Sequence, residues 1–270
     1  MKVEPGYGVL VDLLKNTGGT VVAFSGGVDS SLLLAAAFDA LGDRALGVTA
    51  ASQTYSDDEL FLAKETARGI GARHEVIHTG EMDDGRFTAN PPNRCYYCKS
   101  SLCRAMWDVA GREGFRCVVD GNNADDAGDF RPGHEAAVEQ GVRSPFMELG
   151  IGKEKIRAMA RERGLSNWDM PAHACFASRI PYGEEITTVR LKRIAGAEKS
   201  LGGIGFRQLR VRDHGTLCRV ELPGADLEGA IRPEMRERIV RLCKDAGYTY
   251  VCLDLEGYRT GAMNEVLKRR

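Results

Sequence analysis

The stretch FSGGVDSS at residues 24–31 constrains the fold of this chain more than any other. It follows a short β-branched apolar run, TVVA, which predicts a buried strand, and it leads into LLLAAAFDALG, which predicts a helix ending at Gly42. Two consecutive glycines permit a tight turn between strand and helix. A structural glycine turn is one interpretation. The other is an anion-binding loop, because the first N–H groups of a helix lack partners and carry partial positive charge. Its candidate residues are Ser25, Gly26, Gly27, Asp29 and Ser30.

The same alternation of strand and helix continues through the first two thirds of the chain. Segments of strand character and of helical character follow one another at 44–52, 57–71, 73–79, 99–114, 116–121 and 153–165. This order predicts the α/β class, with a doubly wound, mostly parallel sheet. Ligands of such sheets bind beyond the carboxyl ends of the strands. A second polar loop, DGNNADD at 120–126, directly follows a predicted strand. It offers Gly121 for close approach and Asn123, Asp125 and Asp126 as polar ligands, although an acidic turn is the simpler interpretation.

The pattern changes near residue 183. A helix is predicted at about 186–202, two strands around a turn within 207–222, a helix at 232–247 and a strand at 248–255. We therefore expect two domains, an α/β domain at 1–183 and a smaller C-terminal α+β domain at 184–270.

Composition narrows the classes of function. The net charge is −1, which gives the whole chain no attraction to nucleic acid or to anionic lipid. No apolar run reaches the roughly 18 residues of a membrane helix, and the first residues lack the pattern of a secretory signal. We expect a cytoplasmic protein without a membrane or nucleic-acid partner.

Three of the eight cysteines lie in surroundings that suggest chemistry. Cys95 and Cys98 form a C-x₂-C pair ahead of the helix predicted at 99–114, and Cys175 lies in a small-residue segment. The pair suits a redox disulfide, a zinc site completed by Cys175 and His173, or a [4Fe–4S] cluster with Cys175 as third ligand. The other five occur in apolar periodic segments, which predicts small buried side chains: Cys103, Cys117, Cys218, Cys243 and Cys252.

Resemblance to known families sharpens these alternatives. The string SGGVDS resembles the pyrophosphate loop of the PP-loop ATP pyrophosphatases, and DGNNADD fits their second nucleotide motif. The resemblance implies that the chain binds ATP and Mg²⁺, with Asp29 near the metal, and that it transfers AMP to a substrate oxygen. Adenylation turns a carboxylate oxygen into a good leaving group, which a nucleophile then displaces.

A closer resemblance is to the LarE family of sulfur transferases, which make the nickel-pincer nucleotide cofactor of lactate racemase. It rests on NPPNRCYYCK, DGNNADD, GVRSPF, PAHACFASRIPYGEEIT, LRVRDHG and DLEGYRTGAMN, from about residue 20 to residue 264. It implies adenylation of a carboxylate of pyridinium-3,5-biscarboxylic acid mononucleotide and its conversion to a thiocarboxylate. Cys175 matches the cysteine that gives up its own sulfur in single-cysteine relatives.

The extra Cys95 and Cys98 resemble the three-cysteine relatives. That implies a [4Fe–4S] cluster replenished by an unidentified sulfide donor, with zinc as the alternative metal and a sacrificial Cys175 as the alternative mechanism. Family relatives also imply a homo-oligomer.

The substrate has a phosphate and carboxylates, which favours fixed arginines. Arg210 and Arg212 alternate on a predicted strand and therefore share a face, and Arg259 follows the last strand. By resemblance, Arg210 and Arg259 bind the phosphate, with Arg212 as a further candidate, and the alternative for these arginines is a solvated charged face. By the same resemblance, Ser178 and Arg179 line the reaction site. Resemblance also assigns Glu198 and Glu221 to a divalent metal, with a solvated carboxylate as the alternative. Two other functions are alternatives that the same loops would also allow. One is a tRNA thiolation enzyme, and the other is a non-catalytic protein that binds ATP or metal.

Overall fold

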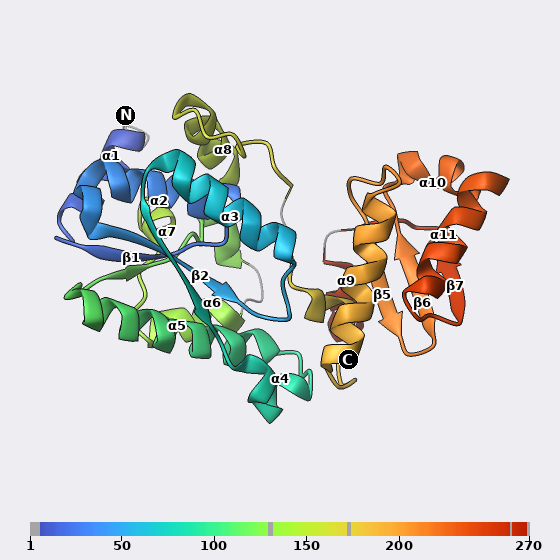
Figure 1. The fold of residues 1–270 in the computed structure, drawn as a ribbon. Helices are drawn as coiled ribbons and strands as arrows, with labels where there is room; N and C mark the ends of the chain where they lie inside the picture. Colours follow the sequence, from blue (N-terminus) through green and yellow to red (C-terminus); the bar gives the residue numbers. More distant parts are fainter. Residues whose placement is uncertain (1–5, 129–131, 172–173, 260, 269–270) are drawn as a thin grey trace. The chain divides into compact units, whose positions relative to one another are not determined.

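The computed structural model describes residues 6–128, 132–171, 174–259 and 261–268 (Figure 1). The chain forms two compact units, one of Met1–Glu81 with Asn93–His173 and one of Met82–Pro92 with Ala174–Arg270. The change of unit thus falls near residue 173, ahead of the expected boundary at 183, and a segment from the first half joins the second unit. Asn90 explains this assignment, because its side-chain amide donates to three carbonyl oxygens of the later segment, those of Ile180, Pro181 and Glu184.

The first unit contains a parallel sheet. Its strand order is β3-β2-β1-β4, and the strands are β1 (Thr20–Ala23), β2 (Ala45–Ala51), β3 (Arg73–His78) and β4 (Val118–Val119). Successive residues of β1 pack against opposite cores: Val21 contacts one and Val22 the other, and both are fully buried. The expected doubly wound α/β fold is confirmed.

Helices cover both faces of this sheet (Figure 1). On one face lie α1 (Tyr7–Lys15), α2 (Val28–Leu41), α3 (Asp57–Ile70), α7 (Pro145–Glu148) and α8 (Lys153–Glu162). On the other lie α5 (Arg94–Glu113) and α6 (Pro132–Glu139). The short helices of the described chain are η1 (Gly42–Arg44), η2 (Glu81–Asp83), α4 (Gly85–Thr88), η3 (Ala124–Gly128), η4 (Phe176–Arg179), η5 (Ala262–Asn264) and α12 (Glu265–Lys268).

The second unit is built on a mixed sheet with the order β5-β6-β7. β5 (Arg210–His214) pairs antiparallel with β6 (Leu217–Glu221), and β6 pairs parallel with β7 (Tyr250–Leu253). One sheet face packs on α9 (Thr188–Gly202), α10 (Gly224–Ile231) and α11 (Pro233–Asp245) through Val211, Cys218 and Val220. Because side chains alternate along a strand, Arg210, Arg212, Arg219 and Glu221 point to the opposite face.

The structure tests the burial predicted for five cysteines. Cys103, Cys117, Cys218 and Cys243 are buried as expected, but Cys252 is exposed, so that prediction is wrong. Cys252 lies on the edge strand β7, opposite Arg219 on β6, on the face that the helices leave uncovered. Its apolar neighbours in sequence, Val251 and Leu253, point to the other face and pack against the core.

In the part of the chain that the structure describes, every helix is too short or too polar to cross a membrane.

Candidate active site

The loop at residues 24–31, called the phosphate loop below after its expected ligand, is held in shape by hydrogen bonds of its own serines. Gly26 has a φ of +76°, which favours glycine, and a Cβ there would lie 2.9 Å from the Cα of Ala63 on α3. The Ser30 hydroxyl donates to the Gly27 carbonyl at 3.0 Å and accepts from the Ser25 amide at 3.2 Å. Gly27 is the extended N-cap of α2, and no side chain caps the helix. The first N–H groups of α2 are therefore aimed at the loop, where an anion can accept from them.

Asp29 lies in the first turn of α2, and Asn123 of the second loop donates to it at 2.8 Å. Burial raises the pKa of the Asp29 carboxyl, while the hydrogen bond from Asn123 and the nearby Lys153 and Arg157 cations act in the opposite direction. A carboxylate made costly by burial, at a helix start whose amides can bind an anion, is a residue that would suit a Mg²⁺ ion.

The two polar loops pack against each other, as expected for segments at the same end of a parallel sheet. A Cβ on Gly121 would lie 3.2 Å from the Ser30 amide nitrogen, so glycine allows the close approach. Within the second loop the Asn123 amide donates to the Asp126 carboxylate at 3.1 Å.

Asp125 has a role that the sequence did not indicate. Its carboxylate accepts from the backbone amide of Lys153 at 2.7 Å and thereby caps the start of α8. Lys153, which sequence reasoning missed, also places its ammonium group 3.3 Å from Asp126. The Lys153 cation thus places a positive charge beside the acidic residues of the second polar loop.

The cysteine pair lies inside a helix. The sequence predicts it ahead of a helix starting near residue 99, but α5 begins at Arg94, directly after Asn93, so that expectation is wrong. Helical geometry puts Cys95 and Cys98 on one side of α5, because residues three apart are neighbours. Cys95 is exposed, Cys98 is partly buried, and neither is in a disulfide.

A buried polar network fixes this end of α5. Lys99 pairs with Asp120 at 3.0 Å, and Ser144 donates to the same carboxylate at 2.7 Å. Asp120 begins the second polar loop, so the pair connects the cysteine-bearing part of α5 to that loop.

In the second unit, Cys175 is held by its backbone. It precedes η4, and its carbonyl oxygen accepts from the Ser178 amide at 3.0 Å and from Arg179 at 3.2 Å. Arg179 also donates to the Ala174 carbonyl at 2.8 Å and forms a two-bonded ion pair with Glu198. Arg179 is buried, with 3% of its side chain exposed, which makes it the internal clamp of the Cys175 turn.

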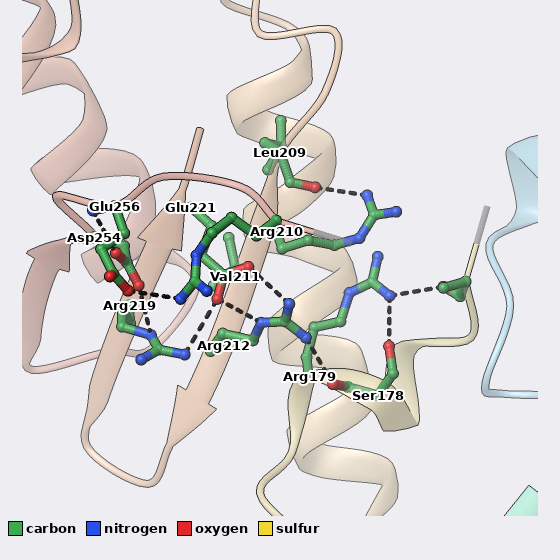
Figure 2. A network of polar contacts seen from close by, with 12 residues as sticks. Ser178, Arg179, Leu209, Arg210, Val211, Arg212, Arg219, Glu221, Asp254 and Glu256 are labelled. Atoms are coloured by element: carbon green, nitrogen blue, oxygen red, sulfur yellow. Dashed lines mark hydrogen bonds and ion pairs between the residues drawn. The ribbon is translucent and has the colours of Figure 1, made fainter. Parts of the chain in front are cut away.

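Three arginines gather beside that turn (Figure 2). Arg212 donates to both carboxylate oxygens of Glu221, at 2.8 and 2.7 Å, and to the Ser178 carbonyl. Arg210 differs, because among the described residues its hydrogen bond goes to the Leu209 carbonyl and not to a carboxylate. Burial, and after it the neighbouring cation of Arg179, lower the pKa of Arg210. A half-buried cation among like charges is a favourable site for an anion.

The remaining predicted residues have other partners. Arg259 is paired with Glu256 and Glu265 at the surface. Glu198 and Glu221 each bind a buried arginine, and no three His, Cys, Asp or Glu side chains within the described residues come together as metal ligands. His173, the fourth ligand of the zinc alternative, lies outside the described residues. The metal roles of Glu198 and Glu221 stay predictions, as does the [4Fe–4S] cluster.

Comparison with known proteins gives a consistent result. No family model matches the chain. The chain is 37% identical over 261 residues to pyridinium-3,5-bisthiocarboxylic acid mononucleotide synthase of Lactiplantibacillus plantarum, which covers 96% of this chain and 94% of that protein. It is 43% identical to an uncharacterized protein of Synechocystis, over 92% of this chain and 93% of the relative. It is 31% identical to an uncharacterized protein of Methanocaldococcus jannaschii, over 89% and 90% respectively.

The similarity to the synthase spans both compact units and therefore includes the phosphate loop, the Cys175 turn and the arginine-bearing sheet face. Identity of this level over nearly the whole of both chains shows that the protein is an enzyme of the LarE family of sulfur transferases.

Proposed function

We propose that this protein uses ATP to activate a carboxylate of a pyridinium mononucleotide and replaces one of its oxygens with sulfur. The observation that carries the proposal is the similarity over 96% of the chain to a synthase of pyridinium-3,5-bisthiocarboxylic acid mononucleotide. The anion-binding loop and the Cys175 turn support it, because such a reaction needs a site for ATP phosphates and a source of sulfur.

The first step is adenylation. A substrate carboxylate oxygen attacks the α-phosphorus of ATP, the bond from that phosphorus to the β-phosphate oxygen breaks, and pyrophosphate leaves. The α2 amides with Ser25, Gly26 and Gly27 bind the departing phosphates, and Asp29 would hold Mg²⁺, which would offset the negative charge of the pyrophosphate. Lys153 offsets negative charge near the second loop.

The second step forms the thiocarboxylate. A sulfur nucleophile attacks the activated carbonyl carbon, the bond from that carbon to the AMP oxygen breaks, and AMP leaves. Arg210 binds the substrate phosphate, and Arg212 with Glu221 keeps the surrounding strand face rigid. Arg179 positions the Cys175 backbone.

The sulfur source has two candidates. In one, three thiolates would hold a [4Fe–4S] cluster, which fits the chemistry of Cys95 and Cys98 because they share one helix side and neither is in a disulfide. Cys175 would be the third ligand, and the cluster, when bound, would supply sulfide from an external donor. In the other, the Cys175 sulfur attacks the carbonyl carbon. The Cβ–Sγ bond then breaks as a base removes the Cα proton, which leaves dehydroalanine.

Activity is tested by adding Mg·ATP and pyridinium-3,5-biscarboxylic acid mononucleotide to the purified protein. We expect substrate-dependent release of AMP and pyrophosphate, and a gain of one sulfur in place of one oxygen in the product by mass spectrometry. A protein that binds ATP yet releases no pyrophosphate with this substrate contradicts the proposal.

The sulfur source is then identified from the metal content of the protein and from the mass of Cys175. Anaerobic preparations are expected to contain about four irons per chain, and Cys175 is expected to keep its mass after turnover. Bound zinc with intact activity excludes the cluster. Loss of H₂S from Cys175, one per product, assigns the sacrificial route.

A further inference from the structure

Asn167 makes contacts that the proposed chemistry does not yet use. It lies just after α8 and is 5% exposed. Its side-chain nitrogen donates to the Gly26 carbonyl at 2.7 Å and to the Ser31 hydroxyl at 2.9 Å. Both partners belong to the phosphate loop or the first turn of α2, and they are 141 and 136 residues away in sequence. The amide therefore connects the last part of the first unit to the loop.

The orientation of this amide is fixed by its partners. The Gly26 carbonyl can only accept a hydrogen bond, so the nitrogen and not the oxygen of Asn167 must face it. The carbonyl oxygen of Asn167 is buried, and no donor among the described residues reaches it. A buried acceptor without a donor costs stability. The two hydrogen bonds that its nitrogen donates to the loop act against this cost.

Gly26 is the residue of the loop whose backbone conformation most favours glycine. Its φ is positive, and a Cβ at this position would lie too close to the Ala63 backbone of α3. Asn167 holds the carbonyl of the same residue from within the core. The Ser31 hydroxyl, held by the same amide, is one residue past Ser30 in the first turn of α2. The loop is thus fixed at both ends by one side chain.

The segment around Asn167 is itself fastened close to Asp29. Arg157 donates to the carbonyls of Trp168 and Met170, at 3.3 and 2.8 Å, and its charge acts on the Asp29 carboxyl. Trp168 and Met170 pack against the core of the first unit. Segment 165–170 thereby contacts the nucleotide loop through Asn167 and lies near its acidic residue through Arg157. The same segment leads along the chain toward Cys175.

We infer that Asn167 is a positioning residue for adenylation, which holds the phosphate loop in its ATP-binding form and couples ATP binding to the order of segment 165–170. The inference rests on the proposed function, because it assigns ATP to this loop. Asn167 itself contacts neither ATP nor substrate; it acts through Gly26 and Ser31.

The test compares Asn167→Ala with Asn167→Ser, which keeps one hydroxyl donor, and with Asn16→Ala, which changes an exposed asparagine directly after α1 and serves as the control. Substrate-dependent pyrophosphate release should give a KM for ATP about tenfold higher in Asn167→Ala, with kcat reduced much less. Asn167→Ser is expected to lie between this variant and wild type, and Asn16→Ala to match wild type. A folded Asn167→Ala protein with an unchanged KM for ATP overturns the inference.

Amide hydrogen exchange provides a second test of the role of Asn167, and this test does not depend on enzyme activity. Without ATP, amides of residues 26–31 should exchange faster in Asn167→Ala than in wild type. With ATP, residues 26–31 and 165–170 should both become protected in wild type, but only the first group in the variant. Equal exchange in the two proteins, with and without ATP, overturns the inference. If wild type binds no ATP while the ATP-free difference persists, the proposed function fails and the positioning of the loop by Asn167 stands.

Discussion

The phosphate loop and the arginine face of the β5–β6–β7 sheet both present positive charge. They differ in whether the charge comes from the backbone or from side chains. In the loop the donors are backbone amides at the start of α2, and glycines shape them. On and beside the sheet face the donors are arginine side chains. Arg212 on β5 is buried and paired with Glu221, and Arg179 on η4 is buried and paired with Glu198. Arg210 is the member without a carboxylate hydrogen-bond partner among the described residues.

This difference determines which substitutions should damage each region. A site formed by backbone amides depends on backbone conformations that few residue types adopt, so substitutions of its glycines should damage it most. A site formed by buried ion pairs depends on charge balance, so removal of one member of a pair should damage it most. The following changes separate these two dependences, beginning with the largest expected effect.

Breaking a buried pair on the sheet face should cost the most. Arg212→Ala leaves Glu221, with 1% of its side chain exposed, without its two-bonded partner, although Arg219 stays at 3.1 Å. We expect a loss of about 3–5 kcal/mol in the free energy of unfolding, measured in urea. The control is Arg232→Ala, an exposed pair with Glu228, which should change stability by less than about 1 kcal/mol. Equal losses in the two variants contradict the comparison.

The phosphate loop should be broken by a single methyl group. Gly26→Ala puts a side chain at a φ of +76° and a Cβ 2.9 Å from the Ala63 backbone. We expect a loss of about 1–3 kcal/mol in stability, together with loss of ATP binding by calorimetry. Gly69→Ala is the control within α3, where a Cβ meets nothing within 4 Å. It should raise helix stability by up to about 1 kcal/mol, and undiminished ATP binding by Gly26→Ala argues against the loop assignment.

Arg210 should affect binding more than stability. Arg210→Ala removes a cation that burial and neighbouring arginines already disfavour. We expect affinity for inorganic phosphate to fall about tenfold, by calorimetry, with a change in unfolding free energy below about 1 kcal/mol. Arg241→Ala, on the exposed side of α11, is the control. Unchanged phosphate affinity in Arg210→Ala removes this residue from the substrate site.

The surface ion pair of Asp39 and Arg163 should have the smallest effect on the free energy of unfolding. It therefore serves as a comparison for the buried pairs. Hydrogen bonds from Arg163, and with them the Tyr7 hydroxyl, hold the pKa of Asp39 below its ordinary value. Because that pKa is depressed in the folded state, the stabilisation is present above about pH 4 and is lost as pH falls further. Asp39→Asn should therefore lower stability by about 0.5–1 kcal/mol at pH 7 and by less at pH 3. A difference that is the same at both pH values contradicts this assignment.

The two regions also differ in how far the sequence predicts them. The strand, glycine turn and helix of residues 20–41 are local, so their periodicity and glycines predict the loop and the parallel sheet around it. The start of α5 was missed because tyrosines and cysteines have weak helix preferences and two prolines precede them. Pairings such as Arg212 with Glu221 depend on strand register across a turn. Asn167 reaches the loop from 141 residues away, and no local pattern marks such a contact.

The clamp on the Cys175 turn has a consequence for the lifetime of the protein. Arg179 and the Ser178 amide bind main-chain oxygen atoms of residues 174 and 175, and these contacts do not involve the sulfur atom. These main-chain contacts therefore do not depend on the chemical state of the side chain. If Cys175 gives up its sulfur, as one of the two proposed routes requires, the spent chain should keep these contacts and should still compete with intact protein for the substrate. A cell that used this route would then have to remove or repair chains that are folded but spent.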